Sequence, residues 1–355
     1  MPSPRSFLPD RAGVHAPLAG APPLGELGPG DPSLTERWPA VQSGLRALFG
    51  TSRPVLVDAL PASAWLDGVL RTAVLHRVLV LVTGTGGERL ARAAEGCGKE
   101  AVRLHVAAGR ALEAEVARQF LDGPPFDAVL IPHVEPGTGV LEPLAELAAT
   151  WRSDGCLVLA DVGYTLGAMP LAVDAWGLDA AWAPSQLALG LSPGLSCAVL
   201  SDRLLARVRG APARGWALDL LRHVAAAERG RPLHAPPPAA MGELLALLDR
   251  LGDTGALAAR SARHAALRAE VDVWAARRGV SLRASEGRRA PTLSVLRVAP
   301  RSAAQVLGAM RERGFALGRP LDDGGDAEVA LGHMGDLDPA ELAMALDALG
   351  QVLKA

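Results

Sequence analysis

The chain has few cysteine and aromatic residues. Its 355 residues include 3 cysteines, and aromatic side chains make up 4% of the total. Cys97, Cys156 and Cys197 stand far apart and show no Cys-x-x-Cys or Cys/His spacing typical of a metal site. They are expected to be free thiols in a reducing compartment, and no metal is predicted.

An excess of charge of one sign is also missing. The formal net charge is -2, and the arginines are scattered among acidic residues, so no basic stripe could follow a nucleic-acid backbone. The apolar runs are too short to span a membrane, and the N-terminal stretch lacks the unbroken apolar segment of a secretion signal. We therefore expect a cytoplasmic protein that binds neither nucleic acid nor membranes.

The length exceeds the size at which one hydrophobic core stops growing, which favours a large domain and a smaller one. Residues 1–32 are rich in proline and glycine without periodicity, and are expected to form an arm lying over the surface. Helical periodicity then begins at Ser33 and continues to Phe49. We predict a large α/β domain over 33–258 and a small α+β domain over 259–355.

Short apolar runs alternate with helical stretches through the first two thirds of the chain. The expected strands are 77–84, 100–106, 127–134, 156–163, 180–185 and 196–201, and helices are expected near 88–96, 111–121 and 141–153. Strands that are apolar on both faces and joined by crossover helices predict a mostly parallel sheet between helical layers. Ligands bind such sheets at the carboxyl ends of the strands.

The C-terminal third has a different pattern. The proline cluster at 234–243 opens a long helical region to about Arg278. A strand is expected at 292–298, and a helix at 340–353 closes the chain.

Several motifs together carry a family resemblance. They read "LVLADVGYTLG" from 157, "PLAVDAWGLD" from 170, "SQLALGLSPGL" from 185, "HVEPGTGVLEPL" from 133, "GTGGERLARAAEGCG" from 84 and "GHMG" from 332. In this combination the chain resembles the class V aminotransferases of fold type I, the alanine–glyoxylate and serine–pyruvate group. The resemblance implies a fold type I transferase-like architecture, pyridoxal 5'-phosphate as the family cofactor, and a homodimer whose sites use residues of both subunits.

The resemblance also implies which positions would bind that cofactor. Asp161 matches the carboxylate that keeps the cofactor ring nitrogen protonated, at the end of a strand. Gln186, Ser63, Gly163 and Thr138 match further cofactor-binding positions.

The chain departs from the family at the residues that carry the chemistry. Leu187 stands where the family has its Schiff-base lysine, and the only lysines are Lys99 and Lys354. Gly86 replaces the aromatic residue that stacks on the cofactor ring. Pro61 enters the phosphate loop, where it offers no amide.

Further departures affect the phosphate and the substrate. Ala235 and Gly242 replace a threonine and a tyrosine that reach the phosphate from the partner subunit. Ala330 replaces the arginine that clamps the substrate carboxylate. Because these contacts are missing together, no catalytic residue is assigned.

Three functional interpretations stay open. The first is a pseudoenzyme that acts by binding a small amino acid or oxo acid, or as a dimer partner. The second is a lysine-independent enzyme that uses His133 or Glu135 in the old cleft. The third is a pyridoxal-phosphate-dependent transaminase of amino acids and 2-oxo acids, with the amine supplied from elsewhere.

Overall fold

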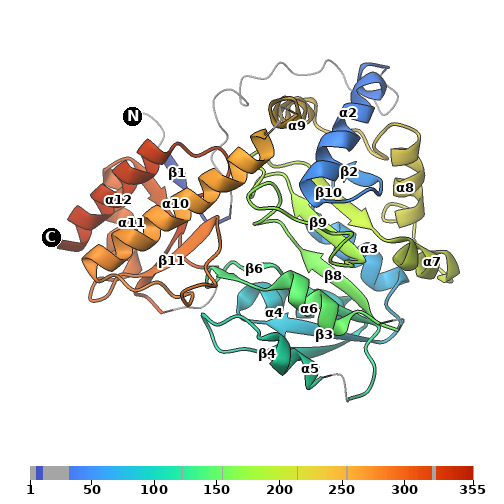
Figure 1. The fold of residues 1–355 in the computed structure, drawn as a ribbon, viewed down its shortest axis with the longest axis horizontal. Helices are drawn as coiled ribbons and strands as arrows, with labels where there is room; N and C mark the ends of the chain where they lie inside the picture. Colours follow the sequence, from blue (N-terminus) through green and yellow to red (C-terminus); the bar gives the residue numbers. More distant parts are fainter. Residues whose placement is uncertain are drawn as a thin grey trace.

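The computed structural model describes residues 5–10, 32–120, 123–153, 155–213, 215–252, 255–321 and 325–354. Its centre is a seven-stranded sheet in the order β2-β10-β9-β8-β5-β3-β4 (Figure 1). The strands, in sheet order, are Val55–Asp58, Ser196–Leu200, Ala180–Pro184, Leu157–Asp161, Ala128–Pro132, Arg77–Val82 and Glu100–His105.

The sheet is mostly parallel, as the apolar runs predict. β4, β3, β5, β8 and β9 pair in parallel, and β10 pairs antiparallel with both β9 and β2. The six expected strands are present, and the run expected at 127–134 divides at His133 into β5 and the short β6. β2 is an addition to the expected strands, because four residues between Pro54 and Pro61 are too short for a periodicity.

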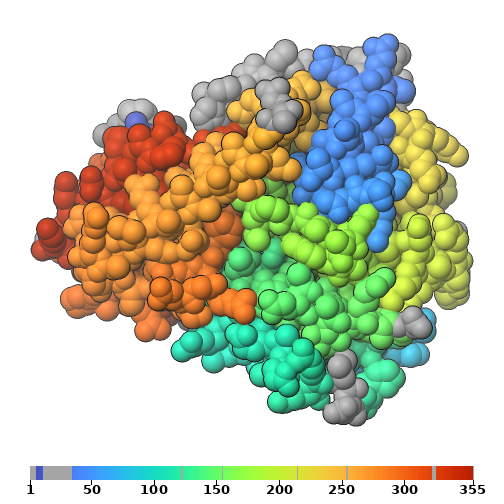
Figure 2. Space-filling view, viewed as in Figure 1, coloured from blue at the N-terminus to red at the C-terminus, as the bar shows by residue number. Residues whose placement is uncertain are grey.

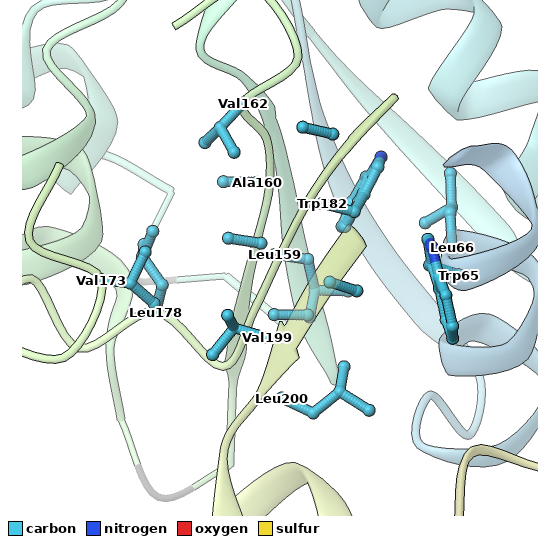
Figure 3. Close-up of a cluster of buried hydrophobic side chains, with 14 of the residues drawn as sticks. Trp65, Leu66, Leu159, Ala160, Val162, Val173, Leu178, Trp182, Val199 and Leu200 are labelled. Atoms are coloured by element: carbon cyan, nitrogen blue, oxygen red, sulfur yellow. The ribbon is translucent and has the colours of Figure 1, made fainter. Parts of the chain in front are cut away.

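Helices cover both faces of this sheet. They are α2 Pro32–Phe49, α3 Ala62–Thr72, α4 Thr85–Gly96, α5 Ala114–Arg118, α6 Leu144–Trp151, α7 Asp202–Gly210, α8 Leu220–Glu228 and α9 Pro238–Leu251. Figure 3 shows Trp65 and Leu66 of α3 on one side of the strands, and Val173 and Leu178 on the other. The sheet is therefore buried on both faces, as expected for a parallel sheet.

A second unit follows along the chain. It contains α10 Ala256–Arg278, β11 Leu293–Arg297, α11 Ala303–Glu312, β12 Phe315–Leu317, β13 Glu328–Gly332 and α12 Pro339–Lys354. The helical region expected as far as Arg278 is two helices, because Gly255 adopts a left-handed φ of 88° before α10. The predicted domain boundary at 258 falls inside α10 and stays a prediction.

The N-terminal arm was expected to hold no regular element, and this is wrong for its first part. β1, Arg5–Phe7, pairs in parallel with β12. Phe7 is buried against Phe315, with ring centroids 6.1 Å apart. Backbone pairing with an edge strand gives this segment its structure, which no local pattern of three residues can predict. Residues 11–31 of the arm lie outside the described residues.

The buried apolar residues form two large clusters. One runs from Leu34 to Leu248, and the other joins Phe7 to residues between Leu267 and Val352. In Figure 2 the orange and red C-terminal part lies to one side of the blue, green and yellow part. None of the helices in the described ranges is long and apolar enough to cross a membrane.

Candidate functional site

A cavity of about 770 Å³ opens at the carboxyl ends of the central strands. Pro132, Asp161 and Pro184 are the last residues of β5, β8 and β9, and all three line it. This is the place where parallel sheets bind ligands. The predicted site residues that line the cavity are Ser63, Asp161, Gln186 and Leu187, with Gly86 and Pro61 of the departing positions.

Asp161 is held by its neighbours. Its Oδ1 accepts the amide hydrogen of Gly163 at 2.9 Å, and its carboxylate also accepts a hydrogen bond from the Trp182 side chain. Burial raises the pKa of Asp161, whereas these hydrogen bonds and the charge of Arg89 act in the opposite direction. The neighbouring backbone amide therefore orients this carboxylate at the end of β8.

Leu187 belongs to an apolar cluster beside the cavity. Its side chain is 9% exposed. The cluster, which we call the apolar side of the cleft, consists of Val134, Tyr164, Leu187, Ala290, Leu293, Val295, Ala330 and Met334. The positions matched with the lysine and the carboxylate clamp thus pack into one hydrophobic group.

The loop matched with the phosphate cradle precedes α3. Residues 59–63 line the cavity, and Pro61 is the residue before the helix, without a side-chain cap hydrogen bond. The amide of Ala64 donates to Pro61 O at 2.8 Å. Ser63 is exposed, and among residues 59–63 it is the one with a polar side chain.

Two predicted cofactor-binding residues are not among the cavity-lining residues. Gly163 lies behind Asp161, where a Cβ would come within 3.0 Å of Leu187 Cδ1. Thr138 is fully buried in the turn between β6, Val134–Glu135, and β7, Val140–Leu141. Its backbone amide donates to Glu135 O at 3.2 Å.

His133 and Glu135 do not line the cavity either. His133 Nδ1 lies 2.9 Å from Thr165 Oγ1, and burial lowers its pKa to about 3. Glu135 is fully buried and accepts the amides of Gly86, Gly87 and Gly137 at 2.9, 3.2 and 2.9 Å. A carboxylate at the start of α4 satisfies amides that the helix leaves open, which gives Glu135 a structural contact there.

One buried arginine fixes the backbone next to Leu187. Arg260 donates to Ala188 O and Leu189 O at 3.0 Å and to Gly167 O at 2.8 Å. It also pairs with Asp336, as do Arg250 and Arg263. Burial alone would raise the pKa of Asp336, but the three guanidinium groups hold it well below its usual range.

Three further residues were not predicted as parts of the site. Arg89, Trp182 and Tyr164 line the cavity, and the Tyr164 hydroxyl donates to Pro9 O at 2.8 Å. Arg89 lies within a quoted motif, and Tyr164 is the single tyrosine of the chain. Those signals could have identified two of them, whereas the contact between Trp182 and Asp161 depends on the pairing of β8 with β9.

Comparison with known proteins identifies the family. The aminotransferase class-V family profile matches residues 78–317. The chain is 25% identical over 321 residues to the "Soluble hydrogenase, small subunit" of Synechococcus sp. (strain PCC 6716), covering 88% of this chain and 83% of that protein. It is 31% identical over 191 residues to 2-aminoethylphosphonate–pyruvate transaminase of Pseudomonas fluorescens. That match spans 53% of this chain and about half (52%) of the transaminase.

Solved structures show the same architecture. An alanine–glyoxylate aminotransferase from Nostoc sp. superposes with a TM-score of 0.90 at 26% identity, over 99% of this chain and 96% of that one. Pyridoxamine–pyruvate aminotransferase from Mesorhizobium loti gives a TM-score of 0.92 at 19% identity, over 99% and 92%, which shows the fold alone. The expected α/β architecture is thereby confirmed. Because the family profile also matches two thirds of its residues, the chain belongs to the class V aminotransferase family.

Proposed function

We propose that this chain is a non-catalytic member of its family that binds a small amino acid or oxo acid in the cavity at the strand ends. The observation that carries the proposal is Leu187, which lines the cavity where the family resemblance places the lysine. A leucine side chain can neither form an imine nor move a proton.

The cavity residues do not fit a cofactor held as an imine. No lysine is among the described residues that line it. Lys99 Nζ donates to Leu75 O at 3.3 Å on an exposed edge, and Lys354 ends α12. A Cβ on Gly86 would come 2.6 Å from Pro136 Cδ, so the place of a stacking ring is also restricted.

The polar groups of the cavity favour a small zwitterion or oxo acid. Asp161 offers a carboxyl group, and Arg89 offers a guanidinium group at the same cavity. Ser63 and Gln186 add a hydroxyl and an amide. Such a set can orient an amino and a carboxylate group, whereas the rest of the wall is largely apolar.

Two titrations of the purified chain test this proposal. The first adds pyridoxal phosphate, followed by absorbance and by borohydride reduction, and we expect neither an imine band nor covalent incorporation. The second adds alanine or glyoxylate in a calorimeter, and we expect saturable binding that is weakened by Arg89→Gln. Lys99→Arg is the matched control for the first titration, because it removes the one lysine amine of the chain outside its last residues. An imine that forms and persists in Lys99→Arg, together with alanine–glyoxylate transfer, would favour the transaminase interpretation.

We also infer a homodimer, because the family resemblance places residues of both subunits in each site, and a cytoplasmic location, because the three cysteines are free. Ala235 is exposed and lies outside the cavity lining of the single chain, which is in line with a position that faces a partner. Sedimentation over the micromolar range tests this inference. A monomer throughout that range would overturn it.

A further inference from the structure

A second polar cluster lies behind the loop that lines the cavity. Asp58 ends β2, His223 lies in α8, and His234 lies four residues before α9. One ligand atom from each of the three residues lies within 4.8 Å of the other two. The described part of the chain thus brings two imidazoles and one carboxylate to a single point.

The distances are close to those of ligand atoms around one ion. His223 Nδ1 lies 3.1 Å from Asp58 Oδ2, and His234 Nδ1 lies 3.0 Å from Asp58 Oδ1. Metal–ligand bonds of about 2.0–2.2 Å in a tetrahedral zinc site place neighbouring ligand atoms roughly 3.3–3.6 Å apart. The His234 side chain is 40% exposed, so its ring can shift toward the other two ligands.

The second nitrogen of His223 gives an independent indication. His223 Nε2 lies 3.0 Å from Ala217 O. A carbonyl oxygen only accepts, so Nε2 carries the hydrogen, and Nδ1 is the ring atom that faces Asp58 Oδ2 at 3.1 Å. Either a second ring proton or a metal ion can join these two atoms, and the experiment below distinguishes them. Metal-binding histidines commonly donate their other ring hydrogen to a backbone carbonyl in this way.

We propose that Asp58, His223 and His234 bind a divalent transition-metal ion. Two imidazoles and a carboxylate suit Zn²⁺ and its neighbours, and the exposed side of His234 leaves a position for water. Asp58 is fully buried and also accepts the amides of Ala59 at 2.7 Å and His234 at 3.2 Å. The carboxylate is therefore held in a fixed orientation before the ion arrives.

The site is next to the cavity wall. Ala59 and Leu60 follow Asp58 directly, and both line the cavity. An ion would fix the start of this loop. Trp65 packs edge-on against His223 with ring centroids 4.9 Å apart, so its fluorescence reports occupation by a quenching ion.

Calorimetry of the full chain, dialysed against a chelator and then titrated with Zn²⁺, tests the proposal. We expect one ion per chain and proton release on binding. His234→Gln and Asp58→Asn should each weaken the affinity at least about tenfold. His105→Gln, at an exposed histidine of β4, is the matched control and should leave the affinity unchanged.

Co²⁺ provides a spectroscopic readout. We expect visible absorption of a low-coordinate ion and quenching of tryptophan fluorescence that Trp65→Phe reduces. If Asp58→Asn fails to fold, the half-exposed His234→Gln still decides. Binding that does not saturate, or that is the same in His234→Gln and His105→Gln, would show that protons alone link these residues and would overturn the proposal.

Discussion

The two sides of the cleft differ in chemistry although both contribute residues to the lining of the cavity. The polar side retains Asp161, Ser63, Gln186 and Arg89 around an open cavity. On the apolar side, Leu187 and seven other residues pack together, including Ala330 of β13. A transaminase site needs an amine and a carboxylate clamp on the second side, and both matched positions there are hydrophobic.

The contrast is between polar residues that line an open cavity and an apolar group at the positions matched with the lysine and the carboxylate clamp. Asp161 ends β8 and accepts the amide hydrogen of Gly163, and the pairing of β8 with β5 sets its position in the sheet. The apolar side instead gains packing between the two parts of the chain. Burial of such side chains stabilises the fold by roughly 1.5–3 kcal/mol each.

Placing an ammonium group on the apolar side should have the largest effect. We expect Leu187→Lys to lower the free energy of unfolding by about 3 kcal/mol or more, because the charge lacks a partner among Tyr164, Leu293 and Met334. Alanine–glyoxylate transfer with added pyridoxal phosphate should stay absent. Leu187→Met conserves the volume and should cost less than about 1.5 kcal/mol in denaturant unfolding. Turnover near that of an ordinary family member would show an intact cleft.

The hairpin of β6 and β7 borders both sides of the cleft, and Glu142 follows it directly. The pH dependence of folding stability that this residue causes should be the next largest effect. Burial raises the pKa of Glu142 to about 7 from 4.5. The folded chain then holds this proton more tightly than the unfolded one, so stability falls as the pH rises from about 4.5 to 7 and is constant above.

Glu142→Gln removes this dependence. The free energy of unfolding of Glu142→Gln minus that of the parent chain should increase by about 2–3 kcal/mol from pH 4.5 to pH 8, measured by urea unfolding at both values. The exposed Glu146→Gln is the control and should show no such change. Parallel stability curves for Glu142→Gln and the parent would contradict the burial of a protonated carboxyl.

Restoring an aromatic ring to the polar side tests whether its space is still open. A Cβ on Gly86 would come 2.6 Å from Pro136 Cδ and 2.9 Å from Glu135 Oε2. We therefore expect Gly86→Trp to lower stability by about 1–3 kcal/mol. Gly96→Ala, in the same helix with nothing within 4 Å, should be neutral or slightly stabilising in thermal unfolding. A stable Gly86→Trp variant would mean that the hairpin moves aside.

The smallest expected effect concerns the contact between the N-terminal segment and the cleft. Tyr164→Phe removes the hydrogen bond to Pro9 O and should cost about 0.5–1.5 kcal/mol in chemical unfolding. Thr150→Ala, which removes an exposed hydroxyl bonded to Glu146 O, should cost less. Equal values would indicate that Pro9 does not hold Tyr164 in solution.

Sequence patterns predicted most of the sheet because its strands are buried on both faces and read as continuous apolar runs. They missed β2 of this sheet and, outside it, β1, β7, β12 and β13. These short segments are strands because partner strands pair with them. For the site, linear motifs singled out Asp161, Gln186 and Leu187, and the structure brings these three residues to one cavity.

The sequence by itself determined that no amine stands in the matched motif, because the chain has only two lysines and neither lies there. The tertiary structure alone decided that Leu187 packs with Ala330, that Trp182 meets Asp161, and that Asp58 meets His223 and His234. The physical reason is distance along the chain. Contacts between residues far apart in sequence depend on strand order and helix packing, which local composition and periodicity do not encode.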